Sequence, residues 1–137
     1  MFKRLFIVII SVFLISFISI FNEKPIFSSF ADSYEVYIAS ASSNAKIVST
    51  TRVSYPFIRS KVGESCKIKN EFNLTDFLSE MGAKVIFTEQ TEEGVSYYAY
   101  SKDIRYEKKI KDQVVNLQVH IGSAGVTVGS PIIFGSF

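Results

Sequence analysis

Residues 115–121 read VNLQVHI, and their alternation decides the class of fold. Every second residue is aliphatic, namely Val115, Leu117, Val119 and Ile121. The residues between them are Asn116, Gln118 and His120. Because successive side chains of a strand point to opposite faces of its sheet, this pattern predicts a strand with one buried and one solvated face. Such half-solvated strands are typical of antiparallel sheets.

The neighbouring segments predict further antiparallel strands. A small-residue turn at residues 122–125 connects the first strand to an alternating partner at residues 126–128. Residues 84–89 and 95–101 are rich in β-branched and aromatic residues and flank a turn that contains glycine, which predicts a hairpin. The second half of the chain is therefore expected to be mainly antiparallel sheet.

Earlier in the chain the strand pattern is less regular. Residues 34–38 alternate, and residues 46–55 are rich in β-branched side chains, so both segments predict strands. Residues 61–65 contain Gly63 and interrupt this pattern. We expect only a short strand to follow, at residues 66–69.

One short helix is predicted at residues 74–81. Asn73 is a good N-cap, because its side-chain oxygen can accept hydrogen bonds from the first free backbone N–H groups. Phe72 and Phe77 have the spacing of a hydrophobic staple, and Gly82 provides a left-handed stop. The apolar stripe consists of Leu74, Phe77, Leu78 and Met81. We therefore expect an α+β fold in which this helix packs on one face of the antiparallel sheet.

The N-terminus predicts a hydrophobic targeting helix. Residues 5–21 carry no charge, no proline and no glycine, and Lys3 and Arg4 precede them. Such a run partitions into a bilayer, and the basic residues keep its start in the cytoplasm. The sequence therefore predicts a signal peptide or signal anchor over residues 1–31 and an exported α+β domain over residues 32–137.

Two fates of this leader remain open. Ser29 and Ala31 place small residues three and one positions before Asp32, which is an acceptable cleavage site. The apolar run is also about long enough to span a bilayer, so an uncleaved anchor is the alternative. The protein is secreted in the first case and held at the membrane in the second. Both cases place residues 32–137 outside the cytoplasm.

Charge argues against a nucleic-acid partner. The part of the chain after Ala31 has 12 basic and 12 acidic residues and is formally neutral. Binding to a phosphate backbone needs a basic face. We expect no nucleic acid, no cofactor and no metal, since only one cysteine and one histidine are present and the carboxylates are scattered.

No catalytic constellation stands out. Cys66 and His120 are the only thiol and imidazole, so a small thiol-dependent hydrolase is one alternative function. Nothing in their spacing requires them to meet. His120 falls on the polar side of the 115–121 strand and is expected to face solvent, whereas Cys66 is expected to be a buried small hydrophobe. The protein is therefore expected not to be an enzyme.

Tyrosines are the preferred candidates for binding. Tyr98 and Tyr100 share one face of a predicted strand, Tyr97 lies on the other face, and Tyr106 follows closely. Exposed aromatic side chains contact protein or glycan partners, whereas ordinary cross-strand pairing is the structural explanation. We expect a binding or assembly module that uses Tyr98, Tyr100 and Tyr106 against an envelope protein or glycan. A carrier of small apolar ligands, with a pocket between helix and sheet, is a further alternative.

The C-terminal hairpin resembles a known family. The stretch from Val115 to Val119, followed by the stretch from Val126 to Ile133, is similar to the C-terminal hairpin of the secreted YwmB-like proteins. The resemblance is confined to this end of the chain. It implies a fold like that of the TATA-binding protein, a curved antiparallel sheet backed by helices, and a bacterial cell-envelope setting. It implies neither DNA binding nor any catalytic residues.

Overall fold

The computed structural model describes residues 2–23, 25–38, 45–51, 55–56 and 61–135. The two helices are α1 (Phe2–Phe21) and α2 (Leu74–Glu80). The strands of the first half are β1 (Asn22–Glu23), β2 (Tyr34–Ile38), β3 (Lys46–Thr50), β4 (Tyr55–Pro56) and β5 (Lys61–Ile68). The strands of the second half are β6 (Ala83–Thr91), β7 (Gly94–Ser101), β8 (Lys108–Ile110), β9 (Gln113–Val115), β10 (Leu117–Gly122) and β11 (Gly125–Ser130).

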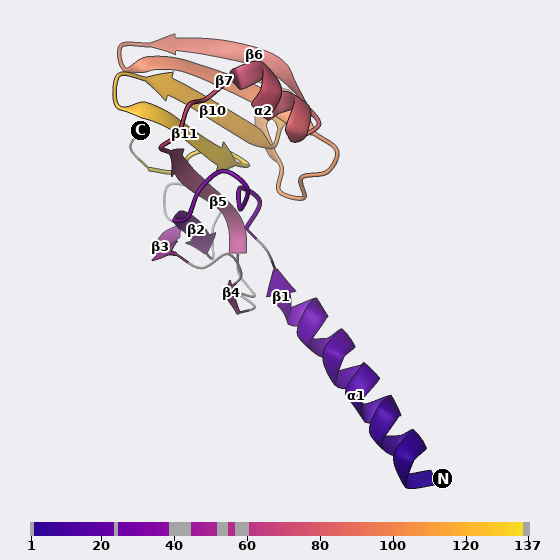
Figure 1. The fold of residues 1–137 in the computed structure, drawn as a ribbon. Coiled ribbons are helices and arrows are strands. Elements are labelled where there is room, and N and C mark those ends of the chain that lie inside the picture. The colour runs from indigo at the N-terminus through magenta and orange to yellow at the C-terminus, as the bar shows by residue number, and fades with distance from the viewer. Residues whose placement is uncertain (1, 24, 39–44, 52–54, 57–60, 136–137) are drawn as a thin grey trace.

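The main sheet has seven strands in the order β3-β2-β5-β11-β10-β7-β6, and every neighbouring pair is antiparallel. Two small ribbons, β1 with β4 and β8 with β9, lie beside it. The helix α2 lies on the sheet near β6 and β7, whereas α1 extends away from the sheet (Figure 1). The predicted α+β class, an antiparallel sheet with a short helix on one face, is confirmed.

The helix α2 begins at the predicted residue, Leu74, and ends at Glu80, one residue before the predicted end. The Asn73 side chain accepts hydrogen bonds from the backbone N–H groups of Thr75 and Asp76, at 2.9 and 3.1 Å. The rings of Phe72 and Phe77 lie 5.4 Å apart, as a hydrophobic staple requires. Gly82 adopts φ +57°, the left-handed conformation that ends the helix.

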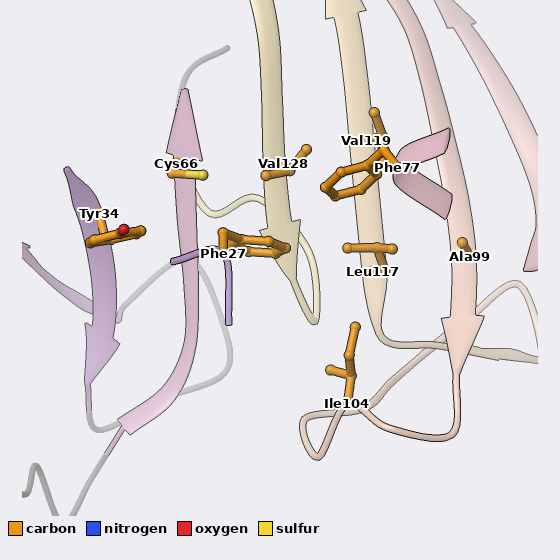
Figure 2. Close-up of a cluster of buried hydrophobic side chains, with 9 residues drawn as sticks. All are labelled: Phe27, Tyr34, Cys66, Phe77, Ala99, Ile104, Leu117, Val119 and Val128. Carbon is orange, nitrogen blue, oxygen red and sulfur yellow. The ribbon is translucent and has the colours of Figure 1, made fainter. Parts of the chain in front are cut away.

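The core lies between the sheet face that α2 covers, α2 itself and the segment of residues 25–31. Its buried members are Phe27, Tyr34, Cys66, Phe77, Ala99, Ile104, Leu117, Val119 and Val128. Most of them come from β2, β5, β11, β10 and β7 in turn, and Phe77 reaches them from the helix (Figure 2). Cys66 is buried among them, as predicted.

Phe27 comes from the predicted leader, yet it is fully buried in this core. Its ring centroid lies 6.4 Å from that of Phe77, and the Phe30 ring meets Phe77 edge to face at 4.8 Å. The folded unit therefore begins before residue 32, where the sequence placed the start of the exported domain. The local sequence carries no signal of this packing, because Phe77 lies far from Phe27 along the chain.

The interruption predicted at residues 61–65 is wrong. These residues form the first part of β5, which continues to Ile68 and lies between β2 and β11. Gly63 serves close packing here, because a Cβ at this position would collide with the carbonyl oxygen of Ser130. The predicted strand at residues 46–55 is shorter in the structure, since β3 ends at Thr50, and residues 52–54 lie outside the described residues.

The strand predicted at residues 115–121 is divided in the structure, because β9 ends at Val115 and β10 begins at Leu117. The polar face predicted for these residues is not solvated, because both faces of β10 are covered. Asn116, Gln118 and His120 are all buried. The Asn116 side chain accepts from Ser101 N at 2.8 Å and donates to the carbonyl oxygens of Ser101 and Ile104 at 2.6 and 3.0 Å. Asn116 therefore fixes the loop that follows β7.

The C-terminal segment covers part of this face. The backbone N–H of Ile133 donates to Gln118 Oε1 at 2.9 Å, and that of Phe134 donates to Tyr37 Oη at 3.1 Å. The Phe134 ring packs edge to face on Tyr37. The C-terminus is therefore docked on the sheet, which helps to explain why the polar side chains below it are buried.

In α1 the structure describes the side chains of residues 3–16, and these are exposed on all sides. The large apolar side chains between Leu5 and Ile15 are 43–74% exposed. The side chains of α1 are described only as far as residue 16, and among the described residues no helix is long and apolar enough to cross a membrane.

Candidate functional site

The strand β6 forms one edge of the main sheet. Among the described strands only β7 pairs with it, so its outer backbone groups have no strand partner there. The register shifts between Val85 and Phe87, which marks a bulge. Val85 and Ile86 lie at this bulge and are each 40% exposed. This edge therefore combines unpaired backbone groups with exposed apolar side chains.

Beside the edge lies an aromatic patch, which consists of Phe87, Tyr98 and Tyr100. Phe87 and Tyr98 pair across β6 and β7, and their rings stack at 4.5 Å with an interplanar angle of 18°. Tyr98 and Tyr100 share this face and are half-buried, whereas Tyr97 packs against the core on the other face. The predicted division of the three tyrosines between the faces is confirmed.

Charged groups fix the rings of this patch. The Tyr98 hydroxyl donates to Glu89 Oε2 at 3.3 Å, and Lys111 Nζ lies 3.0 Å from Glu89 Oε1. The same ammonium group lies 5.4 Å from the centroid of the Phe87 ring. The hydrogen bond and charge of Lys111 hold the pKa of Glu89 below its usual value. Burial, and then the charge of Glu89, raise the pKa of Tyr98.

Tyr100 is held in a similar way. Its hydroxyl donates to Glu107 Oε1 at 3.0 Å. That hydrogen bond and the charge of Glu107 raise the pKa of Tyr100. Both phenols are therefore neutral at physiological pH, and each donates its one proton to a neighbouring glutamate side chain. This arrangement suits recognition of a partner rather than proton transfer.

Tyr106, the third predicted binding residue, contacts a different set of groups. Arg105 Nη2 donates to its hydroxyl at 3.3 Å, and the Arg105 guanidinium lies 5.0 Å from the ring centroid. Lys61 Nζ lies 5.6 Å from the same centroid. Tyr106 therefore packs against cations and is not a member of the aromatic patch.

A buried polar network lies on the same face of the sheet. Ser96 Oγ is 3.0 Å from His120 Nδ1, and Gln118 Nε2 donates to Ser96 Oγ at 3.2 Å. His120 also borders a cavity of about 210 Å³ near the turn at residues 122–125. His120 was predicted to face solvent, and that prediction is wrong because it is buried. Ser96 is buried as well, so its hydroxyl stabilises the sheet and is not presented to a substrate.

The structure does not bring Cys66 and His120 together. Cys66 pairs with Val128 of β11, whereas His120 pairs with the adjacent Thr127. Because neighbouring residues of a strand point to opposite faces, the thiol and the imidazole lie on opposite sides of the sheet. Burial, and then the charge of Glu64, raise the pKa of Cys66 to about 12. The thiol is thus protonated, and no observation favours the thiol-hydrolase alternative.

The Cys66 thiol gives a measurable pH dependence. Since its pKa is about 12 in the folded protein and 9.0 is its ordinary value, the unfolded chain loses this proton first as the pH rises. The contribution of Cys66 to stability is therefore complete below pH 9 and declines between pH 9 and 12. Denaturation at pH 8 and pH 10 should show a larger loss of stability for the wild type than for Cys66→Ala. An equal loss in both proteins would contradict this prediction.

Two further kinds of site remain, one for a metal ion and one for an apolar ligand. In the described part of the chain, no three His, Cys, Asp or Glu side chains are grouped so that they could hold a metal ion. The space between α2 and the sheet is occupied by Phe27, Phe77 and their neighbours. A cavity of about 270 Å³ beside α2 is lined by more polar and charged residues than apolar ones, which does not suit a carrier of apolar ligands.

Comparison with protein-family models, with curated proteins and with solved structures found no match to this chain. The resemblance of its C-terminal hairpin to the YwmB-like proteins accordingly stays a prediction.

Proposed function

We propose that this protein is an exported, non-enzymatic binding module of the bacterial cell envelope, and that it binds an extended segment of a partner protein along β6. The observation that carries the proposal is the open edge of β6 beside the aromatic patch. An unpaired edge offers alternating backbone N–H and C=O groups, which a partner strand can complete with a ladder of hydrogen bonds.

The side chains of β6 support a specific partner rather than self-association. Its exposed Val85 and Ile86 would lose contact with water when a strand is added. Lys84 and the bulge discourage indiscriminate edge pairing. The aromatic patch lies next to this edge and supplies rings for the partner's side chains, and the hydrogen bonds to Glu89 and Glu107 hold these rings in place.

The proposed export rests on the amino-acid sequence of α1. The residues from Leu5 to Phe21 are uncharged, and Lys3 and Arg4 precede them. A helix in a soluble protein usually carries a polar face, but the described side chains of this helix after Arg4 are apolar on all sides apart from serine. The bilayer is the environment that such a surface fits, and the domain then lies outside the cytoplasm.

Site-specific photo-crosslinking in a bacterial host that exports the chain tests the binding edge. A photoreactive amino acid at Ile86 should crosslink to a discrete partner. The matched control is Ile47 on β3, the opposite edge strand, where the side chain is 41% exposed against 40% for Ile86. Crosslinking from Ile86 but not from Ile47 supports the proposal. Equal products from both positions, or none from Ile86, would overturn it.

A second variant distinguishes the addition of a partner strand from non-specific binding to the exposed apolar side chains. Introducing Ile86→Pro into a chain labelled at Val85 removes the backbone N–H of Ile86 at the exposed bulge of this edge strand, a position where proline is tolerated. The crosslinked product should fall by about tenfold or more, as expected for loss of roughly 1.4 kcal/mol of binding energy. If the product is released by glycan digestion and not by protease, the aromatic patch binds a glycan and the proposal of a protein partner fails.

A further inference from the structure

We propose that the chain is not cut after Ala31, and that α1 stays attached as an anchor that holds the sheet close to the bilayer surface. This inference rests on the proposed export by α1. It decides between the two fates of the leader that the sequence leaves open, and the packing of residues 25–31 is what decides it.

Phe27 is part of the core of the domain. This ring is fully buried against the Phe77 ring in the core that α2 shares with the sheet (Figure 2). Phe30 packs edge to face on the same Phe77 ring. Cleavage after Ala31 would remove both rings and leave Phe77 without its aromatic partners from this segment.

The same segment also donates a hydrogen bond to a buried carboxylate. The backbone N–H of Phe27 donates to Glu64 Oε1 at 3.1 Å, while Lys61 Nζ lies 2.6 Å from Glu64 Oε2. Both side chains of this ion pair are buried. A chain that starts at Asp32 would lose the Phe27 donor, and buried charges require such partners.

The residues just before the predicted cleavage site are hydrogen-bonded to one another and to the domain. Residues 26–30 form turns in which Ser28 N donates to Pro25 O at 3.2 Å and Phe30 N donates to Phe27 O at 2.9 Å. The carbonyl oxygen of Ala31 accepts a hydrogen bond from the Tyr34 hydroxyl. The segment that cleavage would remove is therefore hydrogen-bonded to the domain as far as Ala31, the last residue before the predicted cleavage site.

The connection to the helix is also short. α1 ends at Phe21, and β1 pairs with β4 at the next two residues. Only residues 22–24 separate the helix from Pro25, so the connection spans about 14 Å at full extension. An anchored domain would consequently lie close to the headgroups, because its first packed residues follow the helix almost directly.

Expression of the full chain in a host that exports it tests this inference through the intact mass in each cell fraction. The expected species keeps residues 1–31 and resists extraction from membranes at high pH. A soluble extracytoplasmic species that begins at Asp32, or anywhere after Phe21, would overturn the inference while leaving export intact. An intact species in the cytosol would instead overturn the proposed export, and the anchor with it.

A matched variant isolates the cleavage site. Ala31→Phe removes the small residue that processing peptidases need immediately before the bond they cut. We expect wild type and variant to have the same N-terminus and the same membrane-bound fraction. If the wild type begins at Asp32 and the variant keeps its leader, Ala31 is the processing site and the inference is wrong. The mass readout does not depend on how stably the variant folds.

Discussion

Replacing Phe27 with alanine is expected to lower the free energy of unfolding by about 3–5 kcal/mol, the range for removing a buried phenylalanine. The ring is fully buried and stacks on Phe77, so its loss leaves a cavity between α2 and the sheet. Denaturation of the full-length protein in mild detergent, followed by near-ultraviolet circular dichroism, measures the change.

The control for this variant is Phe13→Ala, which removes the same ring from a position that is 74% exposed on α1. Its stability should stay within about 0.5 kcal/mol of the wild type, as is usual for surface substitutions. Equal stabilities of the two variants would show that residues 25–31 do not contribute to the core.

Replacing Lys61 with methionine is expected to lower the free energy of unfolding by about 3–5 kcal/mol. The replacement leaves the Glu64 carboxylate buried without its ammonium partner. The pair lies at 2.6 Å and both side chains are nearly inaccessible to solvent. Denaturant unfolding measures the loss. The double variant Lys61→Met with Glu64→Gln should recover a large part of it, since neither position then carries a charge.

The chain contains a matched exposed pair with the same sequence separation. Lys109 and Asp112 lie 3.2 Å apart, but their side chains are 65% and 96% exposed. Lys109→Met should change stability by less than about 1 kcal/mol, because solvent screens such pairs. If Lys61→Met lowers the free energy of unfolding no more than Lys109→Met does, burial does not strengthen the contribution of the Lys61–Glu64 pair to stability.

Features that depend on neighbours in sequence were predictable. The helix α2 carries its cap, staple and stop within residues 72–82, and each acts over a few positions. The β6–β7 and β10–β11 hairpins likewise combine alternation with a local turn. In both cases one short stretch of sequence contains the interacting residues and the turn that joins them.

Features that depend on distant segments were not predictable. Residue polarity alone placed His120 in solvent, but the turn at residues 122–125 and Ser96 enclose it. The glycine at position 63 indicated a break in the strand. In the structure this glycine allows close packing against Ser130, which belongs to a strand near the other end of the chain. Burial of Phe27 was missed for the same reason.

The candidate site was predicted in part. Strand alternation alone placed Tyr98 and Tyr100 on a shared face. The stacking of Phe87 and the contact of Lys111 with Glu89 required the cross-strand register and the position of the β8–β9 ribbon. Tyr106 was grouped with the other tyrosines by proximity in sequence, whereas its ring contacts Arg105 and Lys61.

The order of strands in the main sheet sets the distance between α1 and the proposed binding strand β6. β6 is at one end of the seven-stranded sheet and β3 at the other, and α1 leaves the molecule on the side away from β6 (Figure 1). Six interstrand spacings of about 4.8 Å give the sheet a width of about 29 Å. If α1 is held in the membrane, β6 would therefore lie away from the lipid headgroups. It could then bind a segment of a partner that does not itself approach the membrane.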